Sequence, residues 1–423
     1  MKYRLFSICA FTALSLPVCT ISAQTASLAE REQELSVLTR RNPDYDPAGT
    51  RFAGFIFHAD LDNVIEHTDN LYSTQSDEIA DTLHIVRPAI EVRSDFSRHF
   101  FSASLTAENG RYVDIEDENY FDYSASINGR VDISRDITAP LSVSYNRGHS
   151  RRSSPDDRGV VEPTKNNELN IGAGLDYKGA TIDASLSNSF KRNTFEDNRT
   201  ETAFVNNNDR NRNQFGTSAT IGLSRELPLS PFLYTGFQKI RYDQKIDDNG
   251  FERSSQSFIT GLGLNLTPSS SLLRSTVRAA YVRRNLDDNR FDSINDFLYA
   301  LNLTWEPSTL MALTLNAERS IEESTLNNIS SSIDTKISAS AVYEFAPNIF
   351  IEPSASYLLR DYKGNADRDL KRMGAEMELL YKLNRNLWVS GQYEYIKQTE
   401  HQNSVEVNDF DRNIYNLSVK LQL

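Results

Sequence analysis

Cysteine is almost absent from this chain of 423 residues, and the two that occur, Cys9 and Cys19, lie close to its start. Both fall in a leader of the kind that is cleaved on export, because Lys2 and Arg4 precede a short apolar stretch and a small-residue cleavage site follows it. We therefore predict a signal peptide over residues 1–23. The mature chain then has no cysteine, which excludes disulfides, thiolate metal sites and a cysteine nucleophile.

Long apolar runs are missing as well. The apolar stretch of the leader, residues 5–18, is shorter than the roughly 20 residues that a membrane-spanning helix needs, and no later segment approaches that length. This pattern excludes a helical membrane protein. A lipoprotein site at Cys19 is an alternative reading of the leader, although Pro17 and Val18 stand where small residues are expected.

Positive charge is in short supply. The chain has 45 Lys and Arg against 58 Asp and Glu, a net charge of −13, and loss of Lys2 and Arg4 with the leader changes it to −15. This balance argues against nucleic acid as a partner. No linker rich in Pro, Gly or Ser divides the chain after Gly49, so we predict one large unit over residues 51–423. Residues 24–50 are polar and form a periplasmic extension in this interpretation, with a short helix at 27–40.

Apolar and polar residues alternate through the last nine positions, up to the carboxyl terminus. A period of two predicts a strand with one apolar and one polar face. Bacterial outer-membrane barrels close with such a strand, in which the last residue is most often Phe rather than Leu. The apolar face would be the signal that barrel-assembly machinery reads, and it consists of Tyr415, Leu417, Val419, Leu421 and Leu423.

The connectors between alternating segments are in turn short and long. Eight short ones carry turn formers such as Pro, Gly, Asn and Asp, and nine longer ones are strongly polar. Short turns at one rim and long loops at the other are typical of an outer-membrane barrel. Seventeen connections predict an all-β transmembrane antiparallel barrel of about 18 strands, with 16 as the alternative. Its first strand is predicted at residues 51–61.

One face of nearly every strand carries charges or hydroxyl groups. A soluble barrel would bury that face, and an unpaired buried charge costs several kcal/mol. The polar face therefore lines a wet interior, and the apolar face meets lipid. At 16 to 18 strands a barrel is wide enough for an aqueous channel. The candidates for lining it are Arg274, Arg278, Lys336, Glu344, Glu376, Glu378 and Glu394.

Three segments in the first quarter of the chain resemble an outer-membrane family called β-barrel porin 2. They are RNPDYDPAG at 41–49, TDNLY at 68–72 and PAIEVRSDFSRH at 88–99, where Phe96 replaces an expected Trp. The resemblance covers residues 42–423. It implies a component encoded beside exopolysaccharide and adhesin machinery, which acts in passage of the polymer across the outer membrane of a Gram-negative bacterium. Periplasmic export components are then possible partners, with lipid and lipopolysaccharide around the barrel.

Catalytic patterns do not emerge. The six histidines form no two-histidine zinc spacing, and no Gly-x-Ser-x-Gly elbow occurs. His149 and Ser150 would point to opposite faces of a strand, which argues against a nucleophile and base pair. We predict no enzyme, no cofactor and no metal site, although acidic loops such as 247–249 could in principle attract calcium. Three functions stay open: a polysaccharide conduit, a general diffusion porin, and a structural or adhesive barrel with a closed lumen.

Overall fold

The chain folds into one closed antiparallel β-sheet. The computed structural model describes residues 36–423 except 155–158, 268–271, 365, 366 and 404; the predicted signal peptide and most of the predicted helix at 27–40 lie outside these residues. Within the described residues eighteen strands form the barrel. They are β2 (Phe55–Thr68), β3 (Asp81–Ser94), β4 (Phe100–Tyr112), β5 (Tyr120–Asp132), β6 (Ile137–His149), β7 (Lys165–Lys178), β8 (Ile182–Phe195), β11 (Arg212–Leu223), β12 (Leu229–Tyr242), β13 (Ser255–Leu266), β14 (Leu273–Leu286), β15 (Ile294–Ser308), β16 (Met311–Glu323), β17 (Ile329–Ala346), β18 (Ile349–Gly364), β19 (Arg368–Lys382), β20 (Leu387–Gln402) and β22 (Phe410–Gln422).

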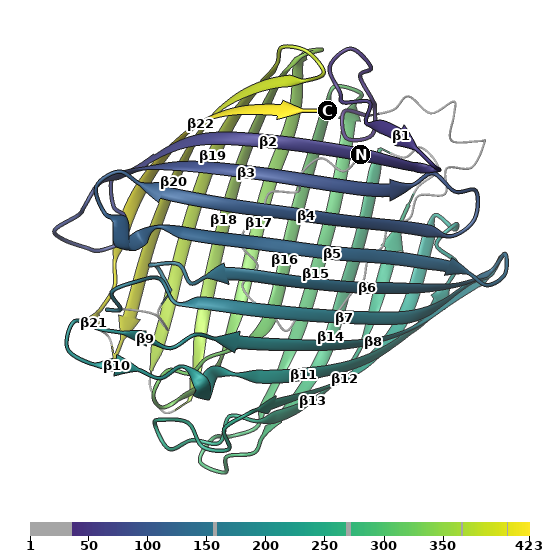
Figure 1. Cartoon of the computed structure of the whole chain (residues 1–423). Helices are drawn as coiled ribbons and strands as arrows, with labels where there is room; N and C mark the ends of the chain where they lie inside the picture. The colour runs from purple at the N-terminus through teal and green to yellow at the C-terminus, as the bar shows by residue number, and fades with distance from the viewer. Residues whose placement is uncertain (1–35, 155–158, 268–271, 365–366, 404) are drawn as a thin grey trace.

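The last strand closes the barrel, as its sequence predicted. β22 pairs with β20 on one side, where Tyr415 lies opposite Tyr393, and with β2 on the other, where Leu421 lies opposite Leu61. The seam between the first and last strands runs between β2 and β22 (Figure 1). The count of 18 strands is confirmed, and the alternative of 16 is wrong.

Short and long connectors separate to opposite ends. We call the end with the short turns and the carboxyl terminus the turn end, and the other the loop end. The loop end carries two 3-10 turns and three minor strands within the described residues, and a further short strand precedes β2 at the turn end. These elements are η2 (Glu116–Glu118), β9 (Asn198–Arg199), β10 (Phe204–Val205), η4 (Asn208–Arg210), β21 (Val405–Glu406) and β1 (Thr50–Phe52).

The prediction for the first strand, residues 51–61, is wrong at both ends. β1 and β2 form a tight hairpin, and β2 continues to Thr68. The sequence misled because Asp62 and Glu66 resemble loop residues. Both lie on the inner face, where Asp62 accepts a hydrogen bond from Ser418 and pairs with Arg87.

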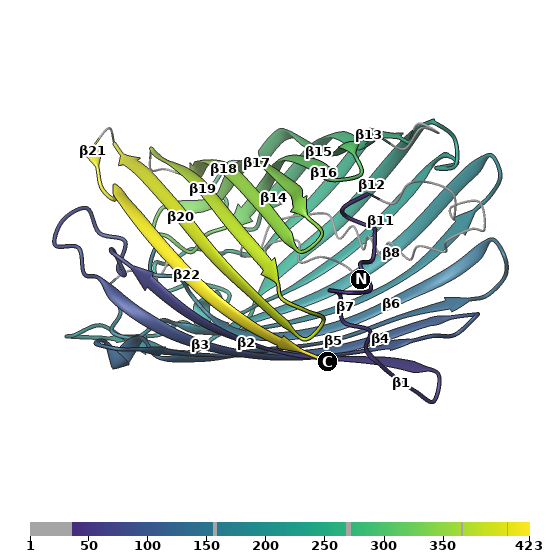
Figure 2. The ribbon, with the colours of Figure 1, turned by 90° about the horizontal axis from the view of Figure 1, so that it is seen from above.

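The two faces of each strand differ as the alternation predicted. On β19, Met373, Met377 and Leu379 are each about half exposed on the outer surface, whereas Arg372 and Glu376 form hydrogen bonds with Gln398 and Gln392 on the inner face. In an antiparallel ladder, residues directly opposite each other point to the same face. The outer face is therefore an apolar belt suited to lipid, and the two walls of the flattened barrel enclose the inner face (Figure 2).

Candidate channel interior

Small neutral polar side chains line the inner face of β4 to β8. Ser104, Ser126, Ser144 and Asn170 lie opposite one another in successive ladders. The Ser104 and Ser126 hydroxyl oxygens are 2.8 Å apart, and Asn170 donates to the Ser144 hydroxyl at 3.3 Å. A second row lies beside it, nearer the turn end, and contains Ser102, Asn128, Ser142, Gly172 and Ser189. We call these two rows the hydroxyl belt.

The opposite wall, on β18 to β20, carries carboxylates. Glu376 lies opposite Glu394 on β20, and Glu378 lies between Glu352 and Gln392. Gln392 donates to Glu376 at 2.7 Å. This wall is therefore acidic at mid-height, in contrast to the neutral hydroxyl belt.

Charged side chains bridge neighbouring strands from β2 to β6. Arg87 on β3 donates to Glu108 on β4 at 2.7 Å and pairs with Asp62 on β2 at 3.4 Å. Tyr120 on β5 donates to Glu108 at 2.7 Å, and its ring packs on His149, whose Nδ1 lies 2.8 Å from Asp122. Each bridge spans adjacent strands, so the network stiffens the wall and satisfies its own charges.

The segment before β1 lies inside the turn end. Val37 is 2% exposed and packs on inner-face residues of β16 and β18, Ala312 and Phe350. Ser36 hydrogen-bonds Glu306 and Arg40 pairs with Glu344, both on the inner wall. We call residues 36–47 the N-terminal segment; Figure 2 shows this stretch of chain between the two walls of the barrel.

Lys382 of β19 anchors the other half of this segment. Its ammonium group is fully buried, lies 2.7 Å from Asp46 and sits over the rings of Phe350 and Trp388 at about 4.5 Å. Trp388 donates from its indole nitrogen to the carbonyl of Tyr45 at 3.0 Å. The Asn-Pro-Asp-Tyr-Asp-Pro motif, residues 42–47, is thus built to dock against the inner wall.

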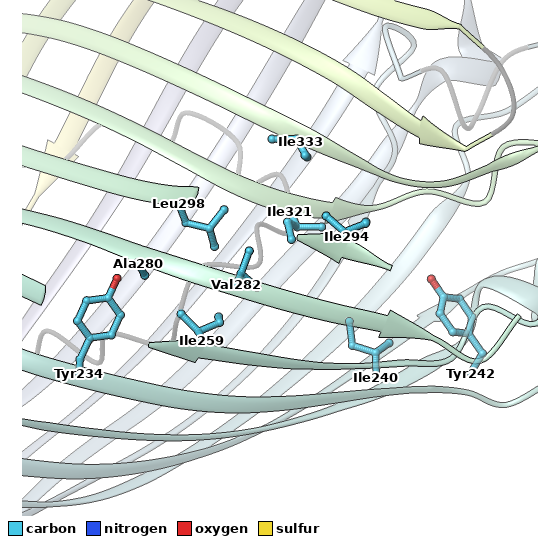
Figure 3. Close-up of a cluster of buried hydrophobic side chains, with 10 residues drawn as sticks. All are labelled: Tyr234, Ile240, Tyr242, Ile259, Ala280, Val282, Ile294, Leu298, Ile321 and Ile333. Atoms are coloured by element: carbon cyan, nitrogen blue, oxygen red, sulfur yellow. The ribbon is translucent and has the colours of Figure 1, made fainter. Parts of the chain in front are cut away.

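The expectation of a wholly polar, wet interior is wrong for one sector. Ten buried apolar side chains from β12 to β17 form one cluster near the loop end (Figure 3), and they are Tyr234, Ile240, Tyr242, Ile259, Ala280, Val282, Ile294, Leu298, Ile321 and Ile333. Alternation along the strands places most of these residues on the inner face. It gave no indication that another element covers them.

The covering element is the loop-end half of the β16–β17 hairpin. On β16, Leu315 and Ala317 lie opposite Leu303 and Leu301 of the outer face of β15, so Ile321 belongs by alternation to the outer face as well. Ile321 nevertheless packs on the inner-face residues of β12 to β15. The hairpin has therefore folded into the lumen, with its outer face against the inner wall.

Polar contacts also show that the outer face of the hairpin lies against the inner wall. Arg319, also of outer-face parity, donates to Asp296 on the inner face of β15 at 2.7 Å. Glu323 forms an ion pair with the fully buried Arg284 of β14 and accepts a hydrogen bond from Tyr242 at 3.0 Å. Pairing between β15 and β16 stops at Ala300 and Glu318, which leaves residues 294–299 of β15 without a strand partner on that side.

The tip of the folded hairpin is fastened by the loop between β12 and β13. Arg253 is 3% exposed and donates to three carbonyl oxygens of the tip, those of Ser324, Leu326 and Ile329. Asp247 in the same loop accepts from Arg253 at 2.7 Å. In the next loop, hydrogen bonds from Arg290 lower the pKa of Asp288 well below its usual range, and Asp288 also accepts from the backbone of Glu252 at 2.9 Å.

A second loop reaches across the loop end. Arg152, after β6, pairs with the buried Glu118 and donates to the carbonyls of Val160 and Val161. One residue further, the carbonyl of Ser153 accepts from Arg372 of β19, on the far wall, at 3.3 Å. The lumen is thus crossed at the loop end by this loop and the folded hairpin together.

The seven predicted lining residues occupy three levels. Arg274 and Glu344 lie at the turn end, where Arg274 pairs with Glu306 and Glu344 with Arg40. Lys336 lies on the folded hairpin and pairs with Glu322 and Asp334. The other four, which face mid-lumen by alternation, are Arg278, Glu376, Glu378 and Glu394.

Sequence reasoning missed Arg253, Asp247 and the docking residues of the N-terminal segment. Arg253 sits in a polar loop without periodicity, so no pattern marked it. The acidic run at 247–249 suggests from sequence only a loop that could attract calcium. In the structure its first residue, Asp247, instead forms an ion pair with Arg253. Within the described residues no group of three or more His, Cys, Asp or Glu could hold a metal ion.

Helices contribute nothing that could span a bilayer: in the part of the chain that the structure describes, none is long and apolar enough to do so.

Comparisons with known proteins give a family and several distant structural neighbours. OpdL of Pseudomonas aeruginosa shares 12% identity, with 88% of this chain and 100% of that chain covered and a TM-score of 0.42. PirA, a siderophore receptor of Acinetobacter baumannii, shares 7%, with 91% and 81% covered and a TM-score of 0.46. A comparison with curated proteins gave no match. The model of the family described as "Putative beta-barrel porin 2" matches residues 42–423, and the chain belongs to that family of outer-membrane β-barrels.

Proposed function

We propose that this barrel is a non-enzymatic outer-membrane channel that assists export of an exopolysaccharide or an adhesive polysaccharide. The observation that carries the proposal is the hydroxyl belt. Hydroxyl and amide groups exchange hydrogen bonds with sugar hydroxyls, and each such bond contributes only about 1 kcal/mol net. A polymer could therefore slide along the belt without being trapped, and a neutral belt imposes no selection by charge.

A general diffusion porin is the second candidate, and the acidic wall favours it. Glu376, Glu378 and Glu394 would attract small cations, as rings of carboxylates do in cation channels. Single-channel recording in a planar bilayer separates the two candidates. A large, constant, cation-selective conductance favours the porin, and a small conductance that polysaccharide blocks favours the conduit.

The hydroxyl belt gives a direct test in cells. Replacing Ser126 and Ser144 by Leu puts an apolar barrier in the belt, while Ser→Thr at both positions keeps the hydroxyl groups and is the matched control. We expect the Leu pair to reduce surface polysaccharide and the Thr pair to leave it near normal, with both proteins heat-modifiable on gels. Normal surface polysaccharide in a strain that lacks the gene would contradict the export role altogether.

Assembly is proposed to depend on the apolar face of β22. Tyr415, Leu417 and Leu421 are about half exposed on the lipid side, which leaves them accessible to barrel-assembly machinery before insertion. Removing residues 415–423 also removes all but one residue pair of the closing ladder with β2. A milder change, Leu423→Asp, leaves that ladder almost intact, so loss of the heat-modifiable species in this variant would specifically support the signal, and normal assembly would contradict it.

A further inference from the structure

We propose that the loop-end half of the β16–β17 hairpin is a hinged gate, which moves between the folded-in position and the barrel wall. The effect of this gate on transport depends on the proposed channel function. The movement itself follows from three features of the hairpin: its reversed packing, the free edge that it leaves behind, and the register that would let it return.

The free edge of β15 is the first indication. Residues 294–299 pair with β14 but with no strand on the other side, although they continue a strand of the wall. An unpaired strand edge leaves backbone donors and acceptors without partners, which is costly near lipid. The amide of Phe297 donates instead to the carboxylate of Asp296 at 2.7 Å, and the same carboxylate accepts from Arg319. Asp296 thus takes the place of a missing backbone partner.

The register supplies the alternative position. Extending the ladder beyond Ala300 and Glu318 would place Leu298 opposite Ser320 and Phe297 opposite Ile321. Ile321 and Ile333, which lie opposite each other, would then join Phe297 on the apolar outer face. The barrel wall would be complete, and the lumen beside β12 to β15 would be free of the hairpin.

Charge favours the folded-in position. In the extended ladder Asp296 would lie opposite Glu322, and like charges directly opposite destabilise a sheet. In the folded-in position Asp296 pairs with Arg319, and Glu322 pairs with Lys336. Arg253 adds its three bonds to the hairpin tip. The gate is therefore closed at rest and held by a latch in a neighbouring loop.

The hairpin would move as part of a small sheet. β17 stays paired with β16 and with β18 up to the loop end. On the other face of this sheet Arg360 of β18 holds Asp334 of β17 through two hydrogen bonds of 2.8 and 2.7 Å. The contacts within this small sheet stay intact when the hairpin moves to the barrel wall. The contacts of the hairpin with β12 through β15 and with Arg253 must break.

Two disulfide pairs test the movement, because no cysteine occurs after residue 19. Leu298→Cys with Ser320→Cys joins residues that are opposite only in the extended ladder, and should trap the open gate. Ile294→Cys with Ile321→Cys joins residues of the buried cluster that lie side by side in Figure 3, and should trap the closed gate. Each pair is oxidised in reconstituted, heat-modifiable protein, and cross-linking and conductance are recorded before and after reduction.

We expect both pairs to cross-link, with a severalfold higher conductance in the oxidised Leu298→Cys/Ser320→Cys protein than after its reduction, and no such rise with the closed pair. Failure of the open pair to cross-link in folded protein would overturn the hinge. Cross-linking that leaves the conductance unchanged would overturn its role as a gate. A barrel that cross-links but conducts in neither state would contradict the proposed channel and leave the hinge supported.

Discussion

The two ends of the barrel are narrowed by different means. At the turn end, a segment that precedes the barrel enters the lumen and docks on an intact wall through Asp46, Arg40 and Val37. At the loop end, the wall itself folds inward and leaves the edge of β15 unpaired. The first arrangement costs only the ordering of the docked residues. The second also gives up strand pairing, so it needs the buried ion pairs and the latch that hold it.

This difference predicts which closure can be removed without harm to the barrel. The N-terminal segment contributes no strand to the wall, and the described barrel closes through β2 and β22 without it. The folded hairpin belongs to the wall, and its removal would open the ladder between β15 and β18. The turn end can therefore be tested by deletion, and the loop end only by loosening contacts.

Deleting residues 24–47 should have the largest effect. The turn end loses every contact between the N-terminal segment and β15 to β20, so we expect a clear rise in single-channel conductance with normal heat-modifiability. Deletion of residues 200–203, which lie in the exposed connection between β9 and β10, is the control and should leave the conductance unchanged. An unchanged conductance without the segment would show that it does not obstruct the channel.

Arg253→Ala should have the next largest effect. It removes three bonds to the hairpin tip and leaves Asp247 buried without its partner, and breaking a buried pair costs about 3 kcal/mol. We expect more frequent openings in single-channel records at the same open-state conductance. Arg147→Ala is the control, because Arg147 lies near the loop end of β6 and pairs with Glu196 rather than with the hairpin or the latch loop. Equal opening frequencies in the two variants would contradict the latch.

Lys382→Met should loosen only part of the N-terminal segment. Asp46 loses its buried partner, but Arg40 and Val37 keep theirs, so the rise in conductance should be smaller than after the deletion. Trypsin added from the turn end should cleave after Arg40 and Arg41 faster than in the unaltered protein. Asp46→Asn combined with Lys382→Met removes both charges and should partly restore resistance; a double variant no better than the single one would argue against the ion pair as the anchor.

The sequence predicted those features of the fold and the site that depend on local neighbours, and it missed those that depend on contacts between distant segments. Period-two alternation and connector lengths predicted 18 strands, the closing role of β22 and the division of the strands into an apolar and a polar face, because these depend on neighbours in sequence and on adjacent strands. The folded hairpin was not predictable in this way. Ile321 and Ile333 continue the apolar face of their strands whether that face meets lipid or the inner wall, so alternation cannot tell the two positions apart.

Long-range docking was likewise hidden from the sequence. The motif at 42–47 was recognisable by resemblance, but its contacts with Lys382 and Trp388 join residues more than 330 positions apart. Arg253 is a similar case, since its partners lie in another loop over 70 positions away. Such contacts arise only once the closed sheet has brought distant strands together.

Acid should have the smallest effect and act at the loop end. Hydrogen bonds from Arg290 keep the pKa of Asp288 below its ordinary value of 3.8, so its ionised form stabilises the loop fully above that value and loses this contribution as the pH falls through the lowered pKa. Asp288 holds the backbone of Glu252, next to the latch residue Arg253. We therefore expect amide exchange in residues 248–253 to stay slow from neutral pH down to about 4. Asp288→Asn should make it faster already at neutral pH, and equal exchange in the two proteins there would show that the latch loop is held without Asp288.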